Sequence, residues 1–501
     1  MGQPAKKTER AASGVTGLDD ILGGGLPCGR MYLVEGDPGA GKTTLALQFL
    51  LEGARAGEPC VYVSLSETEE ELRSMAASHG WNLEGITICD LQSSDESLKA
   101  ESQYTLFHPS DVELSDTTRV VLEAVERVTP RRIVFDSLSE MRLLARDPLR
   151  YRRQVLALKT YFSARDCTVI LLDYQSIDSG ERQLHSLCHG VLALQQLTPE
   201  YGGQRRRLRI QKLRGVSFRD GYHDYRIRRG GLSVFPRLVA AEHRHSFSRE
   251  PLTSDLPDFD RMMGGGLDRG TSTLFLGPAG VGKSTLASQC IMSALNKGKH
   301  AAIYAFDEVP GNLLTRAEGL GMDFVEHAAS GALRLRQIDP AELSPGEFAD
   351  YVREDVESHQ ASVILIDSLN GYRAAMPEEQ HLSAHLHELL SYLNQQGVVT
   401  MLIVAEFGIF GETVAAPMEL SYLADSVVLL RYFEADGEVR KAVSVVKKRT
   451  GSHERVLREF LISSDGLRMG RQLKGLDGLL RGSLVYTGEH ALAESTHGQP
   501  G

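Results

Sequence analysis

Short apolar runs alternate with amphipathic stretches along most of the 501-residue chain. The runs at 30–35, 132–136 and 168–172 are short and mostly apolar, which is typical of strands buried on both faces of a sheet. Between such runs, 118–128 and 151–164 repeat their apolar residues at helical spacing. This alternation predicts an α/β fold, with a mostly parallel twisted sheet covered by helices on both faces.

Other segments continue the same order of elements. Glycines punctuate the strand-rich stretch 208–234, which predicts antiparallel hairpins closing one sheet edge. Further strands are predicted at 59–65, 301–306, 362–367 and 398–404, and further helices at 44–50 and 67–77.

Two glycine-rich segments stand 241 residues apart. Residues 36–43 (GDPGAGKT) and 277–284 (GPAGVGKS) both fit the Walker A phosphate-loop pattern. The same offset relates Asp19 to Asp260, and it recurs between glycine runs and carboxylates around the loops. A register held over so many positions indicates a duplicated domain. The predicted boundaries are a first domain at 1–242, a linker at 243–256, a second domain at 257–470, and a partly disordered tail at 471–501.

The phosphate loops carry the first prediction about chemistry. A strand, a glycine-rich turn and a helix N-terminus form a phosphate site, because backbone N–H groups approach the oxygens and the helix dipole favours negative charge. The lysines would reach the β- and γ-phosphates of ATP, and the hydroxyls of Thr43 and Ser284 would ligate Mg²⁺. An ordinary glycine-rich turn is the alternative, but two loops in matching contexts argue against it. The predicted ATP ligands are Gly36, Gly39, Gly41, Lys42, Thr43 and Thr44, and Gly277, Gly280, Gly282, Lys283, Ser284 and Thr285.

An aspartate ends one apolar strand of each copy. Asp136 and Asp367 each precede a serine, and a carboxylate at the carboxyl end of a parallel strand faces the nucleotide site in this architecture. We therefore expect both to bind Mg²⁺ and its waters, as a Walker B aspartate does. The alternative is an aspartate that caps the next helix.

A glutamate follows the second strand of each copy. Glu67 and Glu308 are predicted to orient and deprotonate the attacking water, and the strand before each is expected to neighbour the phosphate-loop strand. Helix capping is the alternative, since Glu69–71 crowd the first copy. Asp307 precedes Glu308, whereas Ser66 precedes Glu67, so the two sites are not chemically equal.

Basic residues follow a strand near the end of each copy. Lys212, Arg214, Lys447 and Arg449 are candidates to stabilise charge on the transferred phosphoryl group. They lie far along the chain from their own loops. Insertion into a neighbouring subunit of a head-to-tail ring is therefore plausible, and a solvated turn is the alternative.

The composition of the chain argues against several other classes of protein. The net charge is −11, which argues against a protein whose main task is coating nucleic acid. Six cysteines occur without a Cys-x-x-Cys pair, which suggests neither a zinc site nor a disulfide framework and fits a reducing cytoplasm. No apolar run approaches the roughly 18–20 residues that span a bilayer.

Together these motifs resemble the KaiC family of RecA-like ATPases over residues 10–490. The glycine-rich run 17–27 (GLDDILGGGLP), both phosphate loops, the acidic residues, and the segments 212–215 (KLRG) and 458–463 (REFLIS) carry the resemblance. It implies two tandem RecA-like P-loop NTPase domains and a double-ring homohexamer with ATP at subunit interfaces. Lys212, Arg214, Lys447 and Arg449 would then reach in from the neighbour.

The resemblance also implies different tasks for the two rings. The first would be mainly an ATPase, and the second a serine/threonine autokinase. Ser421 matches a phosphoacceptor serine of the clock protein, whereas Tyr422 stands where that protein has a threonine. Phosphorylation of Ser421 is therefore expected, but an ordered two-site cycle is not.

Three functions compete at this point. The first is a hexameric ATPase and autokinase that acts as a signalling or timing switch on protein partners. The second is a RecA- or RadA-like ATPase acting on DNA, which the acidic charge and the absence of a four-cysteine motif disfavour. The third is a nucleotide-gated scaffold with little turnover, which Ser66 keeps open for the first ring.

Overall fold

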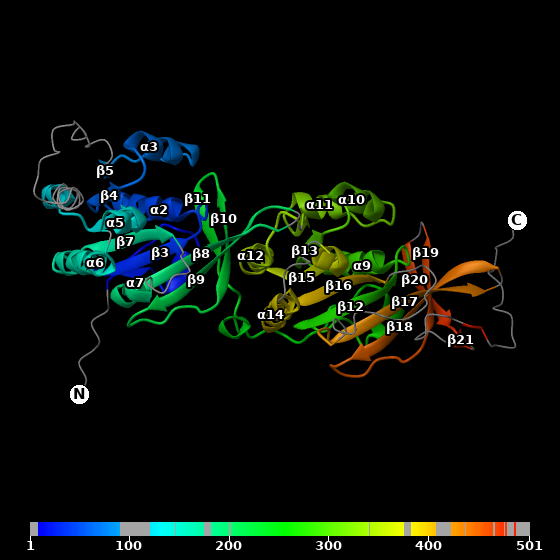
Figure 1. Ribbon diagram of the computed structural model, residues 1–501. Helices are drawn as coiled ribbons and strands as arrows, with labels where there is room; N and C mark the ends of the chain where they lie inside the picture. Colours follow the sequence, from blue (N-terminus) through cyan, green and yellow to red (C-terminus); the bar gives the residue numbers. More distant parts are fainter. Residues whose placement is uncertain are drawn as a thin grey trace, which may run out of the picture. The chain divides into compact units, whose positions relative to one another are not determined.

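The computed structural model divides between Arg237 and Leu238 into two units. Each unit is built on one nine-stranded sheet within the described residues (Figure 1). The predicted fold class, two tandem α/β domains with mostly parallel sheets, is therefore confirmed. The described residues are 9–90, 121–145, 147–174, 182–199, 202–339, 341–374, 382–406, 422–435, 437–463, 466–474, 476–477 and 485–486.

The sheet of the first unit is parallel except at one edge. From edge to edge its strands are β11 (Gly231–Phe235), β10 (Tyr222–Arg228), β9 (Arg205–Leu213), β8 (Gly190–Leu197), β3 (Met31–Gly36), β7 (Thr168–Tyr174), β6 (Arg132–Asp136), β4 (Cys60–Ser64) and β5 (Ile86–Asp90). Strands β8 to β5 are parallel, whereas β9, β10 and β11 pair antiparallel. The predicted hairpins thus close one edge.

Two helical layers cover this sheet, because alternate residues of each strand face opposite sides. Tyr32 and Val34 of β3 face one apolar core, and Met31 and Leu33 face the other. The first layer comprises α1 (Leu18–Leu22), α2 (Lys42–Arg55) and α3 (Glu69–Ser78); the second comprises residues 121–128, α5 (Leu138–Ala145), α6 (Pro148–Ser163) and α7 (Arg182–Leu187). A small separate sheet pairs β1 (Arg10–Ala11) with β2 (Leu26–Pro27).

The second unit repeats this plan. Its strands, from edge to edge, are β14 (Leu333–Gln337), β13 (His300–Ala305), β15 (Ala361–Asp367), β16 (Val399–Glu406), β12 (Thr271–Pro278), β17 (Ser426–Ala435), β18 (Glu438–Lys448), β19 (Arg458–Ser463) and β20 (Gly466–Gln472). One layer comprises α8 (Pro257–Met262), α9 (Lys283–Asn296), α10 (Pro310–Glu318) and α11 (Phe324–Ala329); the other comprises the 3₁₀ turn η2 (Ala240–Glu242), α12 (Pro345–Glu357), α13 (Leu369–Ala374) and α14 (Leu382–Gln395). From β17 to β20 each strand pairs antiparallel with the next.

The strand before each candidate glutamate does not neighbour the phosphate-loop strand. In the first unit β7 and β6 lie between β3 and β4, and in the second unit β16 and β15 lie between β12 and β13. The prediction of adjacent strands was therefore wrong. Apolar runs locate strands in the sequence, but the crossover connections set their order in the sheet.

The segment predicted as a linker, 243–256, belongs to the second unit and packs against the rest of it. The ring of His243 meets the ring of Tyr392 edge-on, with centroids 5.1 Å apart. Phe247 lies so close to Gly270 and Gly397 that a Cβ on either glycine would come within 2.5 Å of the ring. Beyond residue 470, β21 (Leu476–Asp477) pairs with β22 (Val485–Tyr486) inside the segment predicted as a tail.

Candidate functional site

Both glycine-rich loops join the end of a central strand to the start of a helix. Strand β3 ends at Gly36 and α2 begins at Lys42, with Gly41 as its N-cap at φ 90°. Gly282 occupies the same place before α9, at φ 108°. Side chains rarely adopt this left-handed region, so glycine is required at both positions. Each loop therefore presents a helix N-terminus suited to an anion.

The first glycine of each loop is fixed by packing. A Cβ on Gly36 would lie 2.5 Å from the carbonyl oxygen of Leu194, and one on Gly277 would lie 2.3 Å from that of Leu430. Real Cβ atoms do not approach a carbonyl oxygen so closely. The loops therefore run directly against the neighbouring strands β8 and β17.

The loop lysines fold back onto their own loops. Lys42 Nζ donates to the carbonyl oxygens of Gly36 (2.8 Å) and Asp37 (3.0 Å), and Lys283 Nζ makes the same two bonds in the second loop, at 2.8 and 2.7 Å. Burial lowers the pKa of Lys42 and lowers that of Lys283 to about 8. The ring of Tyr174 lies under Lys42, with Nζ 4.6 Å from its centroid. Both ammonium groups are thus positioned to exchange carbonyl oxygens for phosphate oxygens.

A hydroxyl and a carboxylate meet in the first pocket. Thr43 Oγ1 donates to Asp136 Oδ2 at 2.9 Å, and the buried Tyr62 hydroxyl donates to the same oxygen at 2.5 Å. Oxygen donors of this kind suit Mg²⁺, which binds one or two protein oxygens together with phosphates. Glu67 lies nearby: burial raises its pKa, and the charges of Asp136 and Glu71 raise it further. Its carboxylate is therefore a better proton acceptor than a fully solvated glutamate.

The second pocket uses the same acidic positions with different partners. Burial raises the pKa of Asp367, against a hydrogen bond from Ser284 and the positive charge of Arg316. The hydroxyl of Ser368 donates to Asp307. Glu308 Oε1 forms an ion pair with Arg316 Nη1 at 2.7 Å.

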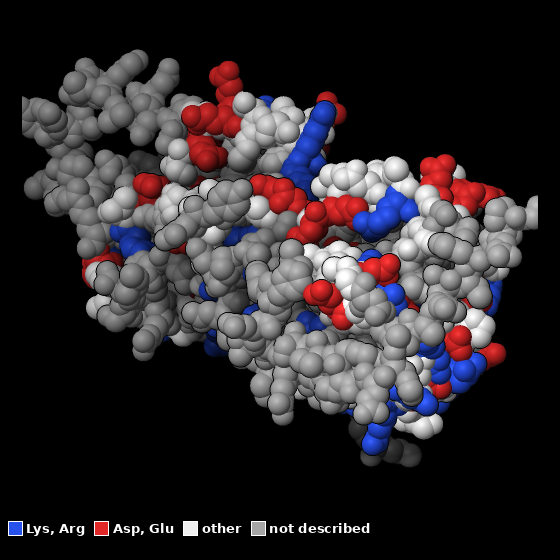
Figure 2. All heavy atoms as spheres, turned by 90° about the vertical axis from the view of Figure 1, so that its right-hand side faces the viewer, with Lys and Arg blue, Asp and Glu red and all other residues white. Residues whose placement is uncertain are grey.

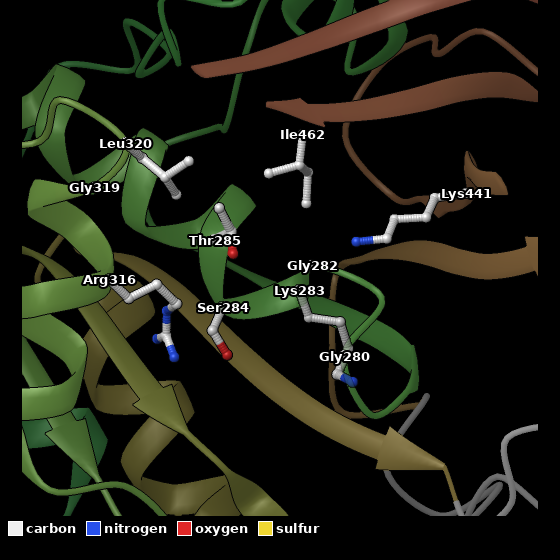
Figure 3. A pocket seen from close by; sticks show the side chains of 10 residues that line it. All are labelled: Gly280, Gly282, Lys283, Ser284, Thr285, Arg316, Gly319, Leu320, Lys441 and Ile462. Carbon is white, nitrogen blue, oxygen red and sulfur yellow. The ribbon is translucent and has the colours of Figure 1, made fainter. Parts of the chain in front are cut away.

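A cavity of about 480 Å³ opens at the second loop (Figure 3). In Figure 3 Arg316 and Ser284 point into the same end of the cavity, and Lys441 reaches toward the loop from β18. Positive charge therefore gathers where phosphates would lie. The lining residues are Gly280, Gly282, Lys283, Ser284, Thr285, Arg316, Gly319, Leu320, Lys441 and Ile462.

The predicted basic residues lie at the opposite end of each sheet from their own loop. Lys212 pairs with Val191, and the preceding Gly190 pairs with Tyr32 near the amino end of β3. The loop begins at Gly36, at the other end of that strand, about 13 Å away at 3.3 Å per residue. The structure therefore does not bring these cations to their own phosphate loop.

All four basic residues donate instead to backbone carbonyl oxygens of their own unit. The bonds are Lys212 Nζ to Cys188 (2.8 Å), Arg214 Nη2 to Ser186 (3.0 Å), Lys447 Nζ to Ala424 (2.7 Å) and Arg449 Nη2 to Tyr422 (2.7 Å). The repeat of this arrangement in both units extends the duplication to the far end of each sheet. Ser421, the candidate phosphoacceptor, lies outside the described residues.

Comparison with known proteins decides the family. A family model described as "ATPase: KaiC" matches residues 11–239 and again 252–474. The chain belongs to the KaiC family. Among curated relatives, a circadian clock protein KaiC3 from Synechocystis sp. is 25% identical, covering 98% of this chain and 97% of the relative. The circadian clock oscillator protein KaiC of Synechococcus elongatus is 26% identical, covering 94% of this chain and 90% of the relative.

This KaiC-family ATPase holds pocket residues that sequence reasoning missed. Tyr62 supports Asp136, Tyr174 lies under Lys42, and Arg316 and Lys441 line the second cavity. Of these residues, only Arg316 could have been recognised from the sequence, because it follows Glu308 by about two helical turns in an amphipathic segment. Within the described ranges, every helix is too short or too polar to cross a bilayer.

Proposed function

We propose that both pockets of this KaiC-family ATPase bind ATP with Mg²⁺ and hydrolyse it, in a cytoplasmic homohexamer that acts as a signalling or timing switch. The observation that carries the proposal is the repeated constellation of loop lysine, loop hydroxyl and strand-end aspartate. In the first unit Thr43 Oγ1 lies 2.9 Å from Asp136 Oδ2, and in the second the Ser284 hydroxyl lies close enough to Asp367 to lower the pKa of that carboxyl. These are the groups that hold Mg²⁺ and phosphate in P-loop ATPases.

Each residue has a defined task in the proposed reaction. Loop N–H groups and Lys42 or Lys283 would hold the phosphates, and Mg²⁺ held by Thr43 and Asp136, or by Ser284 and Asp367, would supply positive charge to them. Glu67 or Glu308 accepts a proton from water as the water oxygen bonds to the γ-phosphorus. The bond from the γ-phosphorus to the bridging oxygen breaks, which releases ADP and phosphate.

The positions of the basic residues support a ring. Lys212 and Arg214 in the first unit, and Lys447 and Arg449 in the second, lie across their sheet from their own loop. A head-to-tail neighbour brings one end of its sheet against the other end of the next, so these cations would complete the neighbour's pocket. ATP would then sit at the subunit interfaces.

For the second unit we propose autophosphorylation in addition to hydrolysis. The hydroxyl of Ser421 would replace water as the nucleophile and yield phosphoserine and ADP. The match in sequence to the phosphoacceptor serine, and relatives named circadian clock oscillator proteins, support this proposal. Clock-type or other signalling proteins would read the phosphorylated state.

Two other functions compete with this proposal. A scaffold that binds nucleotide without turnover would contain the same loops. A DNA-acting ATPase is disfavoured by the net charge of −11, and Figure 2 shows acidic and basic side chains interleaved on the face it draws, outside the grey residues. A nucleic-acid groove would instead concentrate basic residues.

Steady-state turnover with substituted glutamates tests the proposal. We expect Glu67→Gln and Glu308→Gln each to remove the hydrolysis of one pocket and the double variant to lose about 10²-fold or more, because no general base remains. ATP binding should persist in all three. Negligible turnover in the wild type, unchanged in the double variant, would favour the scaffold. In the same incubation, γ-labelled ATP should label Ser421, and label elsewhere or none would remove the kinase part.

A further inference from the structure

The two pockets differ at one position on the helix after the glutamate. In the second unit Arg316 of α10 follows Glu308 by eight residues, and in the first unit Met75 of α3 follows Glu67 by the same number. The 241-residue offset relates Arg316 to Met75 as it relates the glutamates. Met75 packs against the apolar core of its unit. A cation has therefore replaced an apolar side chain beside only one of the two candidate bases.

The guanidinium of Arg316 lies at the end of the second cavity that also holds Ser284. Its Nη1 lies 2.7 Å from Glu308 Oε1, and both side chains are partly buried, with 37% and 26% of their surface exposed. Figure 3 shows Arg316 pointing to the same region as the Ser284 hydroxyl. Charge-assisted bonds of this kind are about twice as strong as neutral ones.

A second nitrogen of the Arg316 guanidinium lacks an acceptor among the described residues. This nitrogen, Nη2, is buried. Buried donors in folded proteins nearly always have an acceptor, so this atom is suited to an oxygen that arrives with a ligand. A phosphate oxygen carries the charge to compete with Glu308 for the guanidinium.

We propose that Arg316 is a positioning residue that restrains Glu308, so that hydrolysis in the second pocket is intrinsically slower than in the first. While Glu308 Oε1 accepts from Arg316, that oxygen is not available for the proton of the attacking water. The carboxylate is free in only the fraction of ATP-filled pockets in which the γ-phosphate draws the guanidinium away, so hydrolysis is slowed and not abolished. A slow pocket retains ATP for longer, which favours phosphoryl transfer to a protein hydroxyl over loss to water. The inference rests on the proposed general-base role of Glu308.

Turnover by the second pocket alone tests the inference. Glu67→Gln silences hydrolysis in the first pocket and leaves its loop intact. In that background, Arg316→Met installs the residue of the first unit, and we expect kcat to rise about fivefold, as loss of a partly exposed ion pair predicts. Arg316→Lys, which keeps the charge, should stay nearer the parent. In the Glu67→Gln, Glu308→Gln protein, Arg316→Met should not raise the residual turnover, because Arg316 acts through the Glu308 carboxylate.

The reciprocal change and a matched control complete the design. Met75→Arg in a Glu308→Gln background should slow the first pocket, provided the thermal unfolding midpoint shows that the core accepts the change. Arg261→Met is the control: it removes the 2.9 Å ion pair with Asp258 on α8, where neither residue lines the cavity, and it should leave kcat unchanged.

Two results separate the failures. If Arg316→Met leaves kcat unchanged or lowers it, Arg316 does not restrain the base, and the inference is overturned although both pockets still hydrolyse ATP. If the Glu67→Gln, Glu308→Gln protein hydrolyses ATP at the wild-type rate, the proposed function itself fails.

Discussion

At the scale of single residues, the two pockets keep one set of carboxylates and change their partners. Asp136 receives the hydroxyl of Tyr62, whereas Asp367 lies in the field of the Arg316 cation. Positive charge and a phenolic donor both stabilise a buried carboxylate, but only the former adds a charge next to the phosphates. A duplicated fold has therefore acquired two electrostatic environments through a few side chains.

The buried loop lysine makes nucleotide binding depend on pH. Burial lowers the pKa of Lys283 in the empty pocket to about 8, so above that pH the amine is largely neutral. ATP binds the charged form, and we therefore expect affinity to fall as pH rises and about one proton to be taken up per second pocket filled at about pH 9. Lys42 adds to the effect in the same direction, because burial lowers its pKa as well.

Titration calorimetry in two buffers with different ionisation heats measures this proton uptake. A difference between the buffers at about pH 9 that shrinks toward about pH 7 would agree with the linkage. Identical heats at the higher pH would show that Lys283 remains charged in the empty protein.

Residue identities on the loops could be predicted from the sequence because the motif spans eight consecutive positions. The partners of the acidic residues could not. Tyr62 reaches Asp136 across 74 positions of sequence, and only the pairing of β4 with β6 brings them together. The role of Tyr174 depends likewise on where β7 ends beside β3.

At the scale of elements, the start of the helix after each loop is the best-determined feature. The sequence predicted a strand, a glycine turn and a helix there, and β3 and α2 confirm them. The strand before each candidate glutamate was predicted to neighbour the phosphate-loop strand, and this was wrong. Periodicity shows where a strand lies in the sequence, but the crossover connections decide its place in the sheet. The local sequence pattern therefore shows where helices and strands lie along the chain, whereas their arrangement in space depends on packing.

The close fit at the start of α2 predicts a large effect for a small substitution. An alanine at position 41 would adopt φ near 90° and place its methyl 2.4 Å from Ile227 Cδ1. We expect Gly41→Ala to cost about 3 kcal/mol, from backbone strain and overpacking together, and to weaken ATP binding by displacing the loop. Chemical denaturation and a nucleotide titration measure both effects.

Gly57→Ala is the control for backbone strain alone. Gly57 has φ 75° and nothing within 4 Å of the added methyl, so we expect a cost of about 1 kcal/mol with ATP binding unchanged. Equal costs at the two glycines would mean that α2 and Ile227 yield easily, and that the fit at the loop is looser than the distances indicate.

At the scale of the whole molecule, the repeat in the sequence predicted two domains, and each unit has its own sheet and apolar cores. The first residues of the second unit, 238–256, were harder to interpret. Leu238 and Ala240 belong to a core of the second unit, and Phe247 packs on its glycines. The segment was interpreted as a linker because most of its residues are polar, and the sequence alone does not show that its few apolar residues pack against a core.

Mixing two inactive proteins tests whether subunits share pockets. With the second pockets silenced by Glu308→Gln, we combine a protein carrying Glu67→Gln with one carrying Arg214→Ala. If Arg214 acts in the neighbour's pocket, a random equal mixture restores about a quarter of the interfaces, because those pair an intact base with an intact arginine. ATP turnover before and after subunit exchange measures the recovery, and Arg261→Met mixed with Glu67→Gln is the reference. If mixed assemblies form but ATP turnover does not recover, Arg214 acts in the pocket of its own subunit and not in that of the neighbour.

The distance between each phosphate loop and its own basic residues also determines how the proposed enzyme responds to a low concentration of its own subunits. A solitary subunit cannot bring the two ends of a rigid sheet together, so dilution would switch hydrolysis off before the fold itself is lost. The rate of ATP hydrolysis would then follow the fraction of subunits that are assembled. Newly made or dissociated chains would bind ATP without hydrolysing it.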